Sequence, residues 1–166
     1  MKSLISLIGS IVITCSLLGQ QMTEARINLE FMNGYWLLDL SVGNPLAIMG
    51  LDTRYPNKGV KFLEMNAYRE LYREYLTNSL VFMIDSHPVE LKNVKVVMNS
   101  AKADGQFISP RFETSGNVIY IECNAYGDLP DHRTFLTVKN GTWMQRDTLN
   151  SSNDFGIQFT VNQTSE

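Results

Sequence analysis

An Asn-Gly pair, Asn33-Gly34, constrains the fold more than any other feature of the chain, because alternating apolar residues flank it over 27–32 and 35–40. Asn and Gly both accept the positive φ angles of a type I′ turn, so the pair predicts a two-residue β-hairpin. The turn also sets the register, in which one face holds three apolar pairs: Phe31 with Trp36, Leu29 with Leu38, and Ile27 with Leu40. The opposite face is mostly polar, so we expect this hairpin to cover a core with one side only.

The composition suits one globular domain. The chain has 166 residues, of which 44% are apolar and 19% are charged. It is too short for two ordinary domains and too apolar for a disordered protein. The formal net charge is -3, and like charges do not form runs. A nucleic acid or an anionic membrane would require a concentrated basic patch, so we expect neither as a partner.

The N-terminus predicts a signal peptide. Lys2 precedes an apolar run from Leu4 to Leu18, which is shorter than the roughly 20 residues that a bilayer-spanning helix needs. We expect residues 1–19 to be removed, or cleavage as late as residue 25, and residues 26–162 to form a single β-sandwich domain. The protein would then be exported to the periplasm, the cell surface or the extracellular space.

The two cysteines bear on this expectation. Cys15 lies inside the apolar run, so the alternative is a lipoprotein that reaches a membrane through a lipid on this thiol. If Cys15 leaves with the signal peptide, Cys123 remains alone and no disulfide forms within the domain. Cys123 alternates with Ile119 and Ile121, which predicts a buried, unreactive thiol rather than a nucleophile.

One stretch has helical periodicity. Over 62–76 apolar residues recur at helical spacing, with polar residues opposite, which predicts an amphipathic helix. Its three tyrosines could form a platform for a ligand or a sugar, but we expect them to contact the core, the commoner role of such a stripe. The stretch after Pro45, which contains Gly50, Pro56 and Gly59, is expected to be irregular.

The rest of the chain predicts short strands. We expect them at 80–84, 89–98, 107–113, 118–123, 134–139, 142–148 and 155–161. The first is continuously apolar, as a strand buried on both faces would be. A second Asn-Gly turn, Asn140-Gly141, would place Trp143 opposite Val138. The fold class is therefore mainly β: an antiparallel β-sandwich of about eight strands with one amphipathic α-helix at an edge or end.

Four segments carry a resemblance to a known family: the helical Tyr68–Leu76, the strand Leu80–Ile84, the aromatic strand Val118–Glu122, and the late hairpin Phe135–Trp143. Their order resembles small exported bacterial β-domains of unknown function, related to the extracytoplasmic domain of HupE/UreJ-type proteins. Those domains commonly begin with a histidine that could bind a metal, whereas Thr23–Ile27 contains none. The resemblance therefore implies export and a β fold, and it supplies no activity.

The polar residues offer few routes to chemistry. His87 and His132 are the only histidines, and neither lies in a nucleophile-elbow, zinc-binding or phosphate-binding motif. If two turn segments met, they could hold zinc or another divalent cation through Asp85, His87, Asp128, Asp131 and His132. We favour the alternative that Asp85 and Asp131 shape turns and that both histidines are exposed loop residues.

Two carboxylate pairs could also be considered as acid and base for glycoside cleavage, Glu90 with Glu113 and Asp39 with Asp52. The sequence does not show the separation that this chemistry requires. We expect an exported, non-enzymatic interaction or structural module without a cofactor, whose partner is another exported or envelope protein. The alternative is a divalent-metal or small-ligand binding protein that uses the Asp128–His132 loop, and an enzyme with an unusual site is a third hypothesis.

Overall fold

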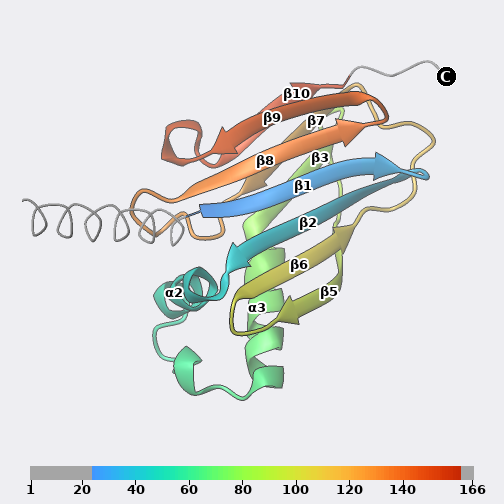
Figure 1. The fold of residues 1–166 in the computed structure, drawn as a ribbon. Coiled ribbons are helices and arrows are strands. Elements are labelled where there is room, and N and C mark those ends of the chain that lie inside the picture. Colours follow the sequence, from blue (N-terminus) through green and yellow to red (C-terminus); the bar gives the residue numbers. More distant parts are fainter. Residues whose placement is uncertain (1–23, 162–166) are drawn as a thin grey trace, which may run out of the picture.

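The computed structural model describes residues 24–161, which form a mainly β domain with two sheets and two helices (Figure 1). The strands are β1 (Glu24–Met32), β2 (Tyr35–Gly43), β3 (Leu80–Ile84), β4 (His87–Pro88), β5 (Lys92–Met98), β6 (Lys102–Ile108), β7 (Val118–Cys123), β8 (Arg133–Asn140), β9 (Trp143–Leu149) and β10 (Gly156–Thr160). The helices are α2 (Asn44–Arg54) and α3 (Met65–Ser79), with short 3₁₀ turns η1 (Val60–Phe62) and η2 (Ser151–Asn153). The predicted signal peptide and Cys15 lie outside the described residues.

The larger sheet has the strand order β5-β6-β2-β1-β8-β9, and the smaller one has the order β10-β7-β3-β4. Figure 1 shows the larger sheet in front, with α3, β3 and β7 behind it. Neighbouring strands are antiparallel except β1 and β8, which are parallel. The expectation of a wholly antiparallel fold was therefore wrong at this pair. A parallel pair requires a crossover connection, and here most of the domain serves as that connection.

The first hairpin has the predicted register. Phe31 pairs with Trp36 and Leu29 with Leu38, and Asn33 and Gly34 both have positive φ. Leu29, Trp36 and Leu38 are fully buried, because this face of the larger sheet packs against the rest of the core. Trp36 reaches Phe82 of β3 with ring centroids 5.9 Å apart, so the two sheets share one apolar interior.

The second hairpin turns one residue later than predicted. Asn140 pairs with Trp143, and the turn residues are Gly141 and Thr142. Val138 therefore lies opposite Gln145 instead of Trp143. Gly141 has positive φ and Thr142 does not, which matches a turn with glycine at its first central position. The Asn-Gly pair thus correctly predicted a hairpin at this point of the chain, but the predicted register was wrong by one turn position.

Helix α2 occupies the stretch that was expected to be irregular. Pro45 lies in its first turn, where a missing N–H costs no hydrogen bond. Its buried side includes Gly50 and Leu51. Gly50 is required by packing, because a Cβ there would lie 2.5 Å from Cδ1 of Tyr126. A glycine inside a helix lowers helix propensity. Because packing requires a glycine at this position, the sequence did not indicate a helix here.

Helix α3 begins at Met65, three residues after the predicted start, and Phe62 lies in η1 with 91% of its surface exposed. Its three tyrosines are buried, as expected. The chain enters β3 directly after α3. In β3 only Phe82 and Ile84 are buried, whereas Val81 is 41% exposed. The prediction of a strand buried on both faces was wrong, because only one face of the smaller sheet meets the core.

Two further strand boundaries differ from the sequence expectation. The stretch 89–98 divides between an irregular segment, residues 89–91, and β5, with a register shift between Asn93 and Lys95. Strand β6 ends at Ile108, where a strand had been expected as far as residue 113. Its buried side includes Ala103 and Gly105, and a methyl group and a hydrogen atom at these positions give too weak an apolar alternation to reveal the strand. Within the described residues, no helix is long and apolar enough to cross a membrane.

Candidate functional site

Asp85 shapes the turn between β3 and β4, as its structural interpretation predicted. It has positive φ, and its Oδ1 accepts hydrogen bonds from the backbone N–H groups of Asn117 at 3.0 Å and Val118 at 2.8 Å. The carboxylate thereby fixes the start of β7 against the end of β3. Charge-assisted bonds of this kind are stronger than neutral ones, so Asp85 is chiefly a structural residue.

His87 is exposed beside this turn, as expected. Its Nδ1 lies 2.9 Å from the backbone oxygen of Asp85. A carbonyl oxygen only accepts, so Nδ1 is the donor, and the neutral ring then carries its lone pair on Nε2.

His132 departs from the expectation of an exposed loop residue, because only 3% of its surface is accessible. Its Nε2 lies 2.9 Å from Oγ1 of Thr134. Its ring stacks with Phe155 at 6.3 Å and approaches Tyr126 at 5.2 Å. Tyr126 belongs to the same β7–β8 connection, whereas Phe155 comes from another part of the chain, so the sequence around His132 could not have predicted the contact with Phe155.

The five predicted metal ligands do not come together. Asp85 binds Val118 at the start of β7, whereas His132 packs against Tyr126, which follows the end of β7 at Cys123. A six-residue strand separates the two ends by roughly 17–20 Å at ~3.3 Å per residue. Within residues 24–161, no group of three or more His, Cys, Asp and Glu side chains could hold a metal ion. A metal at either loop alone stays a prediction.

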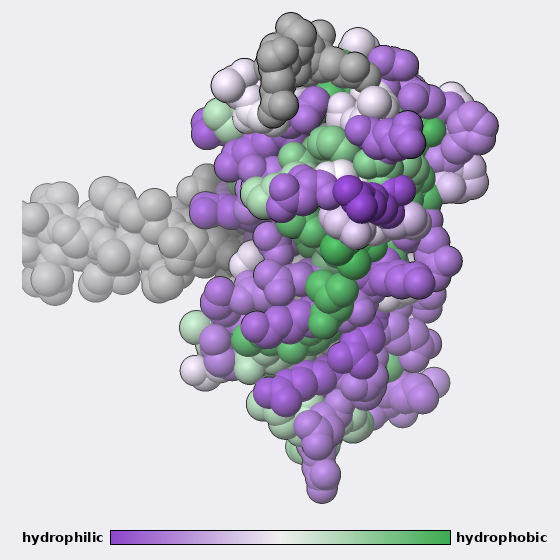
Figure 2. Space-filling view, turned by 90° about the vertical axis from the view of Figure 1, so that its right-hand side faces the viewer, coloured by the Kyte–Doolittle hydropathy of each residue, from purple (hydrophilic) through white to green (hydrophobic). Residues whose placement is uncertain are grey.

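Instead, the predicted ligands are divided among three pockets. One, here called the acidic groove, has a volume of about 610 Å³. It is lined by Ile84, Asp85, His87, Pro88, Val89, Glu90, Pro110, Phe112, Glu113, Thr114 and Gly116. Asp128 lines a smaller pocket near the end of α2, and Asp131 and His132 line a third. Figure 2 shows one side of the molecule, on which apolar surface is exposed between hydrophilic side chains.

The loop after β6 forms one wall of the acidic groove and is anchored to the first hairpin. The backbone N–H of Phe112 donates to the carbonyl of Gly34 at 2.7 Å, and the indole Nε1 of Trp36 donates to the carbonyl of Ser115 at 3.1 Å. Gly116 has positive φ and lies so close to Ile84 that a Cβ would collide with it. These contacts hold the loop against the β3–β4 turn.

The charge of the acidic groove is one-sided. Its described lining contains three carboxylates and one imidazole, and no lysine or arginine. Asp85 is engaged by backbone N–H groups. Glu90 and Glu113 are exposed, and neither forms a hydrogen bond or ion pair among the described residues. Two free carboxylates therefore face solvent beside an apolar floor.

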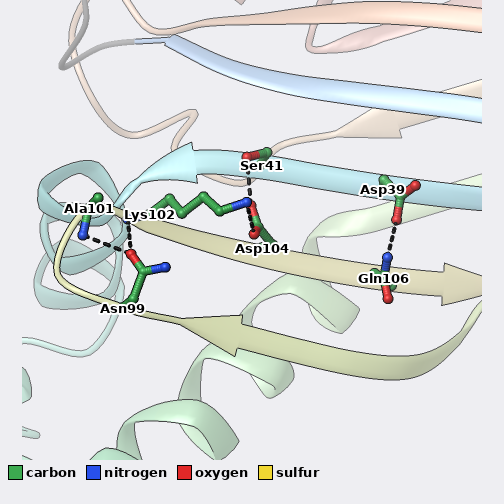
Figure 3. A network of polar contacts seen from close by, with 7 residues as sticks. All are labelled: Asp39, Ser41, Asn99, Ala101, Lys102, Asp104 and Gln106. Carbon is green, nitrogen blue, oxygen red and sulfur yellow. Dashed lines mark hydrogen bonds and ion pairs between the residues drawn. The ribbon is translucent and has the colours of Figure 1, made fainter.

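The other proposed carboxylate pair is not brought together. Asp39 lies on the outer face of the larger sheet and accepts a hydrogen bond from Nε2 of Gln106 at 2.8 Å (Figure 3). Asp52 lies on α2, 3.6 Å from Nζ of Lys61. On the same outer face, Asp104 contacts both Ser41 and Lys102 at 2.6 Å (Figure 3). Asp39 is thus hydrogen-bonded to a neutral amide, and Asp52 and Asp104 lie beside lysines, so these residues leave no free carboxylate pair.

A buried tyrosine network, which the sequence did not reveal, lies beside Cys123. The hydroxyls of Tyr72 and Tyr126 are 2.7 Å apart, and the backbone N–H of Tyr126 donates to the hydroxyl of Tyr75 at 2.6 Å. Burial raises the pKa of all three tyrosines far above their usual range. It also raises the pKa of the Cys123 thiol to about 12. The thiol is therefore buried and protonated, as predicted, and the thiolate needed for nucleophilic chemistry is suppressed.

Comparison with known proteins assigns the chain to no family. No family model matches the sequence, and no curated protein matches it significantly. The resemblance to exported bacterial β-domains therefore stays an expectation, and the function has to be argued from the geometry.

Proposed function

We propose that the protein is a non-enzymatic binding module that acts after export, through a sandwich-like β domain, and docks a basic, partly apolar segment of another exported protein. The acidic groove is the docking site. The observation that carries the proposal is the combination of an apolar floor with two carboxylates, Glu90 and Glu113, that form no ion pair among the described residues. Charge complementarity of this kind selects partners and speeds their encounter.

The apolar part of the groove favours an amphipathic occupant over a simple cation. Pro88, Val89, Pro110 and Phe112 lie among its lining residues, and a lysine or arginine side chain covers such surface with its aliphatic stem. The head group of that side chain would then reach Glu90 or Glu113. Burial of the stem and pairing of the charge therefore support the same kind of ligand.

The position of the groove favours an extended segment. Strand β4 is the last strand of the smaller sheet, so it has no sheet partner on its outer side. Its residues His87 and Pro88 are exposed and also line the groove. An extended peptide can lie along such an edge while its side chains enter the neighbouring pocket. The short edge and Pro88 limit uncontrolled strand pairing.

Peptide binding tests this proposal. Short peptides that alternate lysine with leucine, and charge-reversed versions with glutamate, would be titrated by fluorescence anisotropy at two salt concentrations. We expect only the lysine peptides to bind, and more weakly at high salt, because screening weakens exposed charge pairs. The double variant Glu90→Gln, Glu113→Gln should lose about tenfold in affinity, a loss of ~1.4 kcal/mol. The matched control, Glu64→Gln at the N-cap of α3 with Glu74→Gln within α3, changes two other exposed carboxylates and should bind normally.

Two results would contradict the proposal. Equal loss of binding in the groove variant and in the control would remove the groove from the interaction. Hydrolysis in a broad substrate screen that disappears in the groove variant, while its fold persists, would show that Glu90 or Glu113 takes part in catalysis instead. N-terminal sequencing of the protein from an exporting host tests the export step, since an intact Met1 would refute removal of the leader.

A further inference from the structure

A second, more enclosed pocket lies where α2 ends, beside the last turn of α3 and the loop that follows β7. It has a volume of about 200 Å³ and is lined by Arg54, Tyr75, Ser79, Asn124, Gly127, Asp128 and Phe155. We call it the Arg54–Asp128 pocket. Its volume lies below the roughly 300–1,000 Å³ of pockets for drug-sized ligands. The pocket is therefore suited to a very small molecule rather than to a peptide.

Opposite charges line this pocket without neutralising each other. Arg54 and Asp128 form no ion pair or hydrogen bond among the described residues. Both charges nevertheless lie close enough to the Tyr75 hydroxyl to influence it. Burial is the main cause of the raised pKa of Tyr75, and the hydrogen bond from Tyr126 opposes it; Asp128 raises this pKa further, whereas Arg54 lowers it. A cation and an anion thus flank one buried phenol.

The walls of the pocket are held by specific contacts. The backbone N–H of Asn124 donates to the carbonyl of Ser79 at 3.0 Å, and that of Cys123 donates to the carbonyl of Phe155 at 2.9 Å. Phe155 has a φ of 57°, a conformation that is unusual for a bulky residue and is often found at binding sites. Gly127 is packed against the Phe155 ring, since a Cβ there would lie 3.1 Å from Cε2. The surroundings therefore fix where the ring stands.

We propose that the Arg54–Asp128 pocket binds a small zwitterion of the free amino acid class. The guanidinium of Arg54 offers two parallel N–H donors to a carboxylate. The carboxylate of Asp128 accepts from an ammonium group, and the Phe155 ring covers the adjoining carbon atoms. A ligand with both charges satisfies both walls at once, whereas a simple anion or cation leaves one of them unpaired. This pocket is separate from the acidic groove, so the inference does not depend on the proposed function.

The experiment uses free L-amino acids as probes, one at a time, at up to about 10 mM, which detects binding with a Kd of ~1 mM or tighter. Calorimetry measures the affinity, and the amide signal of Gly127 in nuclear magnetic resonance spectra reports binding at the pocket. For each amino acid that binds, the corresponding acid without the amine and the corresponding amine without the carboxylate are also titrated. The variants are Arg54→Gln and Asp128→Asn. Their controls are Arg146→Gln and Asp131→Asn, which alter exposed charges outside the pocket.

We expect at least one amino acid to bind and to shift the Gly127 signal. Both pocket variants should weaken that binding at least about tenfold, with unchanged melting temperatures, and both controls should bind normally. The analogues that lack one charge should bind the unaltered protein no more tightly than the amino acid binds the two pocket variants. The absence of binding by every amino acid overturns the inference, as does equal affinity for the single-charge analogues. Binding that survives both pocket variants overturns it as well.

Discussion

The Tyr72–Tyr126 hydroxyl pair makes a prediction whose magnitude follows from burial. Tyr72 is 0% exposed and Tyr126 is 1% exposed, and their hydroxyls, 2.7 Å apart, have no other hydrogen-bond partner among the described residues. Replacing either residue by phenylalanine removes the bond and leaves the other hydroxyl buried without a partner. The remaining void is smaller than the space a water molecule needs. We expect each single variant to lose about 2 kcal/mol of unfolding free energy.

The double variant Tyr72→Phe, Tyr126→Phe should behave differently. It removes both polar groups together, so no unpaired hydroxyl is left, and the expected loss is only about 1 kcal/mol. The singles sum to about 4 kcal/mol, which gives a coupling of roughly 3 kcal/mol, at the upper end for contacting residues. The double variant is therefore expected to be more stable than either single variant, although it lacks more hydrogen-bonding groups.

Urea denaturation of the four proteins measures this cycle, with equal m values as the condition for comparing midpoints. Tyr55→Phe serves as the control, because Tyr55 is half-buried and its hydroxyl has no hydrogen bond among the described residues. It should change stability by less than ~0.5 kcal/mol. If the double variant loses the sum of the single losses, the two hydroxyls act independently and the argument from an unpaired buried group is refuted.

Three further predictions concern the core. Cys123 should resist alkylation at about pH 8 in the native protein and react after unfolding in guanidinium, because burial raises its pKa to about 12 and only the thiolate attacks; rapid native labelling would contradict this. Burial raises the pKa of Tyr68 from 10.0 to about 12, so the folded state holds this proton more tightly than the unfolded state. The contribution of Tyr68 to the free energy of unfolding should be fully present below pH 10.0 and should decrease as the pH rises toward about 12. Tyrosinate absorbance together with circular dichroism measures this. Leu38→Ala, at a fully buried position, should cost about 3 kcal/mol in denaturant unfolding, against under ~1 kcal/mol for Leu37→Ala on the outer face.

The sequence predicted what short-range chemistry decides. The Asn33-Gly34 turn specified a hairpin and its register, and the period of α3 identified a helix with buried tyrosines. At Gly141 the same logic failed by one residue, because a glycine can occupy either central position of a tight turn. Helix α2 was concealed because Gly50 serves the packing of Tyr126 rather than the propensity of its own helix.

The candidate sites depended on contacts that local patterns do not contain. The turn role of Asp85 was predicted, since an aspartate bonds nearby backbone groups readily. Glu90 and Glu113 were considered as a pair, but the sequence could not show whether they meet, because their meeting requires the loop after β6 to lie against the β3–β4 turn. Arg54 was missed for the same reason: nothing in its own segment indicates that Asp128 lies across a pocket from it.

The parallel pairing of β1 with β8 affects when the larger sheet can form during synthesis and folding. Glu24 lies beside Arg133, so the middle of the larger sheet has to wait for a segment about a hundred residues downstream, and folding governed by such distant contacts is slow. During synthesis the first hairpin would have no neighbour on that side. A polypeptide that folds late stays unfolded for longer, and an unfolded chain can pass through a translocation channel. Export directed by the predicted signal peptide would need this property.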